Sequence, residues 1–266
     1  MPTKAEIIEK VKQYVYTNRN ALPSYFRINE DKQYLGWVSK LAVGLDGKKD
    51  SLDLAQEKDL FILFALAGAW SHTGPWENGA YFAAYLKNSD WTIEEWKSDA
   101  FCEKKASEAK KWAEDVSQQA TTRRHLSFRE EFCDTTHRLA MVWDDVKTAL
   151  ASAQQSADWL SFVNFLRNLK ILKHGEKALR IKIPFILREM RCQKLYSNIP
   201  GELCCIADQR VKEAYESLFG KNLPTDYLKA SAEIYKDWGD LYDMPLFSLV
   251  VDKKTGKRDL EVDLAK

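Results

Sequence analysis

The chain has 266 residues, of which 45% are hydrophobic and 12% aromatic, and it carries a formal net charge of +1. This composition is typical of a folded globular protein and excludes an intrinsically disordered chain. The longest apolar run, residues 60–70, is too short for a membrane-spanning helix, and residues 1–12 lack the apolar stretch of a signal peptide.

Hydrophobic residues recur at helical spacing along most of the chain, and no pair of alternating segments indicates a β-hairpin. Thr92, followed by Glu94 and Glu95, is an N-cap signal for a helix that runs to about residue 118. In chain order, the other predicted helices cover residues 4–17, 33–43, 53–70, 76–87, 127–153, 157–172, 208–218, 225–238 and 243–251. The length allows one large domain or two compact lobes, and we expect an all-α domain over residues 1–251, followed by a polar, loosely ordered tail at residues 252–266.

The five cysteines are odd in number and show no paired Cys-x-x-Cys spacing, and the four histidines show no metal-ligand spacing. This pattern argues against a disulfide framework and a zinc ribbon, and free thiols fit a reducing compartment. We expect a cytoplasmic protein with no metal and no cofactor.

Positive charge is concentrated in one segment, residues 161–194, which holds nine Lys or Arg against two Glu. Such a stripe is either a footprint for phosphate groups or a solvated helix face. The nine residues, here called the basic stripe, are Arg167, Lys170, Lys173, Lys177, Arg180, Lys182, Arg188, Arg191 and Lys194.

The same segment predicts a helical hairpin over about residues 160–192, with a short turn at Gly175. Backbone N–H groups at such a turn can hold a DNA phosphate without reading the base sequence. Lys177 falls in the first turn of the second helix, where the helix dipole lowers the pKa of an ammonium group. A neutral amine there suits Schiff-base chemistry, and the alternative is a lysine that contacts phosphate.

Gly175-Glu176-Lys177 resembles the hairpin of bifunctional DNA glycosylases in the helix-hairpin-helix, Gly-Pro-Asp superfamily. In that family the lysine attacks the sugar, and a downstream aspartate assists. Asp208, in IADQRV, lies 31 residues after Lys177, a spacing similar to that of the archaeal-type 8-oxoguanine glycosylases. Without the resemblance, Asp208 is interpreted as a helix N-cap.

Three further segments resemble that branch: DKQY at 31–34, SHTGPWENGAYFAAYL at 71–86 and DMPLF at 243–247. The resemblance implies that Gln33, Trp76, Asp243 and Phe247 bind the extruded base. It also implies phosphate contacts from Lys170, Lys173, His174 and Gly175.

The chain departs from the family pattern at several of these positions. Lys173 replaces the first hairpin glycine, and Phe247 replaces a tryptophan. Trp70 competes with Trp76 for the stacking position, and Pro184 is expected to restart the second hairpin helix.

The implied function is a monomeric DNA glycosylase and AP lyase that removes a damaged base, foremost 8-oxoguanine, from double-stranded DNA at the nucleoid. Two alternatives remain. The chain could be a DNA-binding protein of this fold without catalysis, or an enzyme of this fold that acts on another modified base or a nucleoside.

Overall fold

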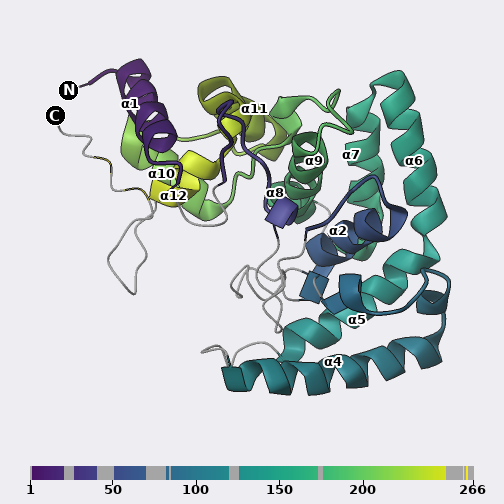
Figure 1. Cartoon of the computed structure of the whole chain (residues 1–266). Coiled ribbons are helices and arrows are strands. Elements are labelled where there is room, and N and C mark those ends of the chain that lie inside the picture. The colour runs from purple at the N-terminus through teal and green to yellow at the C-terminus, as the bar shows by residue number, and fades with distance from the viewer. Residues whose placement is uncertain are drawn as a thin grey trace. The chain divides into compact units, whose positions relative to one another are not determined.

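The computed structural model describes residues 2–20, 27–40, 51–69, 82–83, 85–119, 126–172, 176–249, 260 and 262. Over these residues the chain is helical, with no β-strand, which confirms the all-α prediction (Figure 1). A single β-bridge joins Ile28 and Tyr34 within this described part. No helix of the described residues is long and apolar enough to cross a membrane.

The chain divides into two compact units. Unit 1 contains residues 1–37 and 179–266, and unit 2 contains residues 38–178. The predicted hairpin therefore crosses the boundary between the units, which falls after Ala178.

Unit 2 contains α2 (Glu57–Ala69), α4 (Asp99–Gln119), α5 (Leu126–Met141), α6 (Trp143–Ser156) and α7 (Trp159–Asn168). Residues 82–83 and 85–88 are also helical, and 3₁₀ turns cover Val38–Lys40, Glu95–Lys97 and Lys170–Leu172. Helix α5 packs against both α2 and α4.

The core of unit 2 is rich in aromatic rings. The Phe61 ring lies 5.0 Å from the Trp143 ring and 5.8 Å from the Trp91 ring, and Trp91 in turn contacts Trp96. Aromatic pairs of this kind, two of them edge to face, add to the stabilisation from burial itself. Most of the tryptophans of unit 2 that the structure describes thus serve the core.

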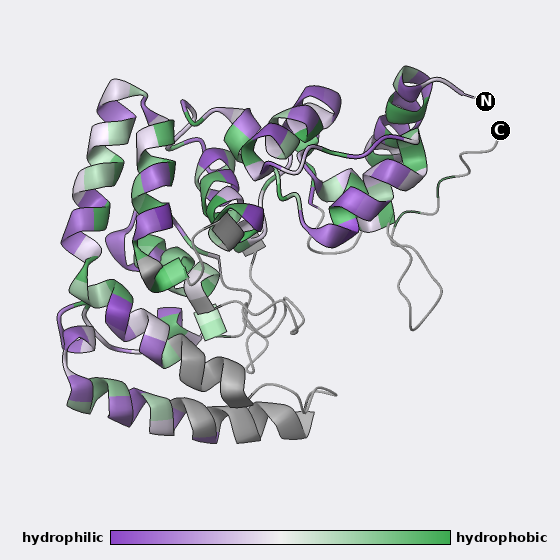
Figure 2. Ribbon diagram, turned by 180° about the vertical axis from the view of Figure 1, so that it is seen from behind, coloured by the Kyte–Doolittle hydropathy of each residue, from purple (hydrophilic) through white to green (hydrophobic). Residues whose placement is uncertain are grey.

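Unit 1 contains α1 (Lys4–Thr17), α9 (Lys182–Cys192), α10 (Gln209–Phe219), α11 (Tyr227–Trp238) and α12 (Met244–Leu249). Helix α8 (Glu176–Arg180) spans the boundary of the units. Two 3₁₀ turns, Gly201–Leu203 and Gly239–Leu241, flank the long helices. Figure 2 shows hydrophobic and hydrophilic residues alternating along the helices, as amphipathic helices require.

Helix α1 has the bounds that the sequence predicted. Thr3 and Glu6 form a capping box, in which the Thr3 side chain accepts from the Glu6 N–H and the Glu6 carboxylate accepts from the Thr3 N–H. The Lys4 ammonium lies 2.6 Å from Asp237 and joins α1 to α11.

Several predicted helices are interrupted. The prediction of a helix over 33–43 is wrong for residues 33–37, because Gly36 has a φ of +76°, which breaks a helix. Thr92 Oγ1 accepts from the Glu95 N–H at 3.2 Å ahead of the 3₁₀ turn at Glu95–Lys97, and the α-helix begins only at Asp99, after the extended residue Ser98. The helix predicted over 127–153 is broken at Val142.

Of the tail at residues 252–266, the structure describes only residues 260 and 262. Leu260 is fully buried, Val262 is buried, and the Leu260 N–H donates to the Ser248 carbonyl at 3.0 Å. The two apolar side chains in an otherwise polar segment thus pack on unit 1.

Candidate functional site

The segment predicted to form the hairpin contains α7, the 3₁₀ turn at Lys170–Leu172 and α8, and residues 173–175 between them lie outside the described residues. Lys177 is the second residue of α8, so its predicted place in a first helical turn is confirmed. Its side chain, that of Lys170, and the whole of Lys173, His174, Gly175, Trp70 and Trp76 lie outside the described residues.

The second hairpin helix is shorter than expected. Helix α8 ends at Arg180, Ile181 leaves helical geometry with φ −139°, and α9 begins at Lys182. Pro184 lies in the first turn of α9, which confirms the predicted restart, although it is the third helical residue and not the first. Because α8 has only five residues, it presents a shorter helix at Lys177 than the sequence predicted.

Asp208 is the N-cap of α10. Its Oδ1 accepts a hydrogen bond from the Val211 N–H at 2.9 Å, and its backbone is extended. The interpretation that the residues alone favoured, an N-cap, is therefore confirmed. Asp208 is half-buried, so its carboxylate also keeps contact with solvent.

Asp243 is hydrogen-bonded to the segment that precedes α10. Its side chain is buried, and its Oδ1 accepts from the Ile206 N–H at 2.9 Å and from Arg188 Nη1 at 3.0 Å. Burial raises the pKa of Asp243, and the positive charge of Arg188 opposes the rise. The charge of Asp208 also reaches Asp243 and raises its pKa.

Phe247 lies in α12, one helical turn after Asp243, and the Phe247 N–H donates to the Asp243 carbonyl at 2.9 Å. Its half-buried ring lies 5.6 Å from the guanidinium of Arg210, two residues after Asp208. Unit 1 thus brings together Asp208, Asp243 and Phe247, which sequence analysis selected.

Gln33 is exposed and lies in the turn closed by the Ile28–Tyr34 bridge, where its N–H donates to the Asn29 side chain at 2.9 Å. It lines a pocket of about 380 Å³ in unit 1, the Gln33 pocket. The walls include Tyr34 and Tyr242, whose rings meet edge to face with centroids 6.1 Å apart. Asp208, Asp243 and Phe247 do not line this pocket, although Asp243 follows Tyr242 directly.

Arg191 fixes the polar wall of the Gln33 pocket. Its guanidinium donates to the carbonyls of Ser197 and Ile199, at 3.0 and 2.7 Å, and to Asp240 at 3.1 Å. Its remaining nitrogen, Nε, donates to the Tyr242 hydroxyl at 3.2 Å. Every nitrogen of this guanidinium is therefore engaged within unit 1.

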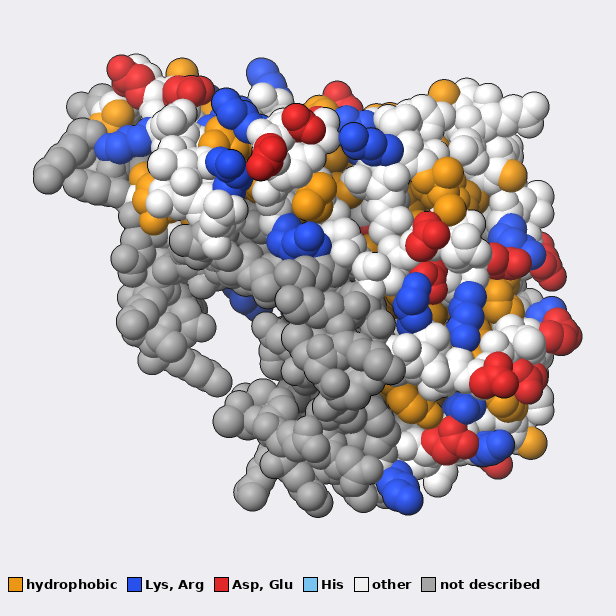
Figure 3. Space-filling view, viewed as in Figure 1, with side chains coloured by type: hydrophobic (Ala, Val, Ile, Leu, Met, Phe, Trp, Pro, Cys, Tyr) orange, Lys and Arg blue, Asp and Glu red, His pale blue; other side chains and the backbone are white. Residues whose placement is uncertain are grey.

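The basic stripe is not a continuous phosphate footprint. Arg188 and Lys182 are buried, and Arg191 is engaged by the contacts above. Acidic and basic side chains are interspersed on the described part of the face seen in Figure 3. The prediction of a nine-residue surface is wrong for Lys182 and Arg188, which are buried in α9, whereas Arg191 is half-buried and its guanidinium is paired within unit 1.

Sequence analysis placed Arg188 in the basic stripe and missed its buried role. Its guanidinium is fully buried and lies 5.6, 5.6 and 5.8 Å from the rings of Tyr34, Trp37 and Phe185. Its Nε donates to Glu189 at 3.4 Å, so Arg188, Glu189 and Asp243 form a buried ionic cluster. An arginine within the apolar run IPFILREM was the available signal.

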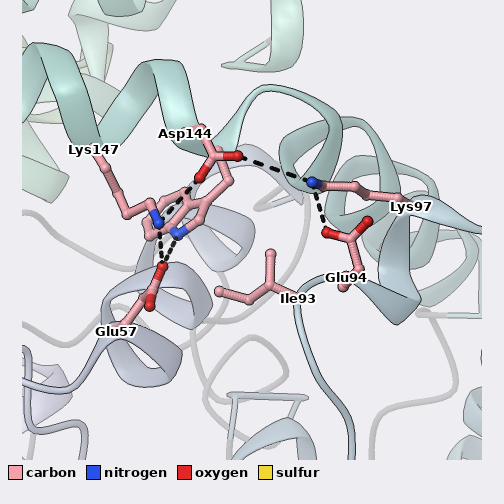
Figure 4. A pocket seen from close by; sticks show the side chains of 7 residues that line it. Glu57, Ile93, Glu94, Lys97, Asp144 and Lys147 are labelled. Carbon is pink, nitrogen blue, oxygen red and sulfur yellow. Dashed lines mark hydrogen bonds and ion pairs between the residues drawn. The ribbon is translucent and has the colours of Figure 1, made fainter.

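Unit 2 has a pocket of a different kind, of about 250 Å³, lined by Ile93, Trp143 and five charged side chains (Figure 4). Lys147 lies 2.7 Å from Glu57 and 3.1 Å from Asp144, and Lys97 lies 2.7 Å from Glu94. Each charge of this ring has an opposite partner, so the pocket offers a ligand no unsatisfied ion.

Nothing in the described part of the chain forms a cluster of three or more His, Cys, Asp or Glu suited to a metal ion. Burial raises the pKa of Cys192, Cys204 and Cys205 above the ordinary value, which keeps these thiols protonated and unreactive. Among the described residues, the polar side chains that a ligand can reach most readily are Asp208, which is half-buried, and those that line the Gln33 pocket.

Comparison of the chain with protein-family models, with curated proteins and with solved structures finds no match.

Proposed function

We propose that this protein is a DNA glycosylase and AP lyase that removes a damaged base, foremost 8-oxoguanine, through a Schiff base at Lys177. The proposal rests on the resemblance of the G-x-K segment, Asp208 and the three base-site segments to the helix-hairpin-helix glycosylases. The partner is double-stranded DNA, and no cofactor takes part.

The observation that best supports the proposal is the proximity of three residues in unit 1. Asp208 lies near enough to Asp243 to affect its pKa, and Phe247 lies beside Arg210, two residues after Asp208. These residues are up to 39 positions apart in sequence, and the resemblance selected them without knowledge of the fold. The nearby Gln33 pocket, about 380 Å³, has the size and the aromatic lining of a small-molecule site.

In the proposed reaction, the ε-amine lone pair of Lys177 bonds to C1′ while the bond from C1′ to the base breaks. The electrons of that bond leave with the base, which takes up a proton. The new amine then passes a proton to the ring oxygen as the sugar opens, which gives a Schiff base. Loss of a C2′ proton and departure of the 3′-phosphate cut the strand.

Asp208 has two tasks in this scheme. Its negative charge stabilises the positive charge that develops on the sugar, and it favours the neutral form of the attacking amine. Gln33 and Asp243 would hydrogen-bond the extruded base, and Trp76 and Phe247 would stack on it.

The test is trapping with borohydride, which reduces the Schiff base to a stable amine. Wild-type protein is incubated with a panel of duplexes, each with one damaged base, and 8-oxoguanine is expected to give the strongest adduct. Lys177→Ala should abolish the adduct, and Lys236→Ala, at an exposed site of α11, should leave it unchanged. A full-intensity adduct with Lys177→Ala would refute the assignment.

One observation favours a second candidate, a DNA-binding protein of this fold without catalysis. The cap hydrogen bond to Val211 accounts for Asp208 without any chemistry. Asp208→Asn separates the two, because asparagine caps a helix about as well as aspartate. If Asp208 is catalytic, this variant should melt and bind DNA like the wild type but cleave about 10²- to 10³-fold more slowly. An unchanged rate would favour the cap alone.

A further inference from the structure

The buried ionic cluster contains an arginine that is held unusually firmly. Three aromatic rings, those of Tyr34, Trp37 and Phe185, surround its guanidinium, and Glu189 and Asp243 accept from two of its nitrogens. The third nitrogen, Nη2, is buried and has no acceptor among the described residues. An incompletely satisfied buried guanidinium is costly, so a requirement beyond packing is a natural explanation for it.

The contacts of Asp243 show what Arg188 achieves. Asp243 Oδ1 is fixed from two directions, by Arg188 Nη1 at 3.0 Å and by the Ile206 N–H at 2.9 Å. Ile206 precedes the Asp208 cap by two residues, so this carboxylate also ties the start of α10 to the start of α12. Removing Arg188 would free one side of the carboxylate.

Arg188 is also the positive charge that faces Asp243 in this cluster. The other titratable groups that act on Asp243 or on Arg188 are negatively charged when ionised, and they come from every neighbouring element. They are Tyr34 in the N-terminal segment, Glu189 and Cys192 in α9, Cys204 and Cys205 before α10, and Asp208 at its cap. Without Arg188, Asp243 would be a carboxyl group among potential negative charges.

We propose that Arg188 is a positioning residue that orients the Asp243 carboxylate, and thereby sets recognition of the damaged base. This inference rests on the proposed function, in which Asp243 accepts a hydrogen bond from the base. Arg188 itself is buried and acts through Asp243. Its influence should therefore fall on base recognition more than on the chemistry at C1′.

Two duplexes separate these steps. One carries 8-oxoguanine, and the other carries an abasic site, which has no base to recognise but can still form the Schiff base. Arg188→Lys should reduce adduct formation on the 8-oxoguanine duplex more than on the abasic duplex. We expect the ratio of the two rates to fall by roughly 10- to 100-fold, as for a misplaced positioning group. Arg138→Lys, at an arginine of α5 paired with Asp134, is the matched control.

A second readout does not depend on activity. The Asp243 carboxyl carbon is followed by NMR in protein labelled with ¹³C-aspartate. In Arg188→Lys its pKa should rise, because a shorter side chain draws the positive charge away. Should Arg188→Lys fail to fold, Asp243→Asn provides the test, since it retains an oxygen acceptor for Ile206 and loses the charge. The same fall in the ratio is expected.

The outcomes are distinct. Equal losses on the two duplexes, or an unchanged pKa of Asp243, would overturn the role of Arg188 and leave the glycosylase proposal standing. Absence of any adduct from the wild type on both duplexes would refute the proposed function, and with it the role in base recognition.

Discussion

The two units each contain an ionic cluster, and the two clusters have opposite surroundings. In unit 2, the charged ring of Figure 4 links α2, α6 and the segment before α4, and its acidic members are 53–79% exposed. In unit 1, the side chains of Arg188, Glu189 and Asp243 are at most 3% exposed. Ion pairs of similar groups at similar distances are therefore expected to contribute differently to the free energy of unfolding.

The difference follows from solvation. Water screens the exposed ring, so each of its pairs contributes little to stability. The buried cluster has lost that water, and the attraction and hydrogen bonds between its opposite charges replace the lost hydration. Breaking the first should weaken unit 2 slightly, whereas breaking the second should destabilise unit 1 severely.

The largest effect is expected from Arg188→Met. This change leaves the carboxylates of Asp243 and Glu189 buried beside an apolar side chain, with a loss of about 3–5 kcal/mol in the free energy of unfolding. Urea unfolding at neutral pH measures it. Arg210→Met, at an exposed arginine of α10, is the matched control and should change stability far less. A loss below about 1 kcal/mol in Arg188→Met would show that the cluster is solvated like a surface pair.

A second prediction concerns the sign of the pH dependence. The pKa of buried Asp243 is raised, so its stabilising effect is complete below its unfolded value of 3.8 and is lost as pH rises through the folded pKa. The pKa of Glu57 is lowered by its hydrogen bond to Lys147, so its effect is present above 4.5 and is lost as pH falls through the folded pKa.

Urea unfolding between about pH 3 and pH 7 tests this for Asp243→Asn and Glu57→Gln. The stability advantage of the wild type over Asp243→Asn should shrink as pH rises, and its advantage over Glu57→Gln should grow. Parallel trends would mean that burial does not separate the two clusters.

A smaller effect is expected from Lys147→Met. It removes the ion pairs to Glu57 and Asp144, but both carboxylates remain in water, and Glu57 keeps its hydrogen bond from Trp143 Nε1 at 3.0 Å. The loss should be at most about 1 kcal/mol. Thermal unfolding measures it, and a loss comparable to that of Arg188→Met would contradict the comparison.

The smallest effect is the response to salt. Raising NaCl to about 1 M shortens the screening length to about 3 Å and should remove most of the difference between Lys147→Met and the wild type. The difference between Arg188→Met and the wild type should persist, because ions do not reach the buried cluster. The same unfolding measurements at two salt concentrations decide the matter.

The sequence predicted best those elements whose signals are local. The capping box of Thr3 and Glu6 and the caps Asp208 and Asp226 define helix starts within a few residues, and α1, α10 and α11 lie where they were expected. Pro184 marks the break at Ile181, whereas the breaks at Ser98 and Val142 could not be predicted, because no glycine or proline marks them. There, tertiary packing overrides a continuous hydrophobic pattern.

The candidate site was predictable only in part. A motif can select Asp208, Asp243 and Phe247, and their proximity agrees with that selection. The burial of Arg188 could not be read from local sequence, because its partners Tyr34, Trp37 and Asp243 come from distant segments. A basic residue in a basic segment was therefore interpreted as a surface residue.

The contact between Trp37 and Arg188 gives the protein an optical signal. Trp37 and Trp238 are the two tryptophans of unit 1, and the other seven belong to unit 2. Total fluorescence therefore reports mainly on unit 2, while the indole of Trp37 faces a fixed positive charge 5.6 Å away. The difference in emission between the wild type and Trp37→Phe isolates this ring, so that a change at the buried cluster can be followed without a label.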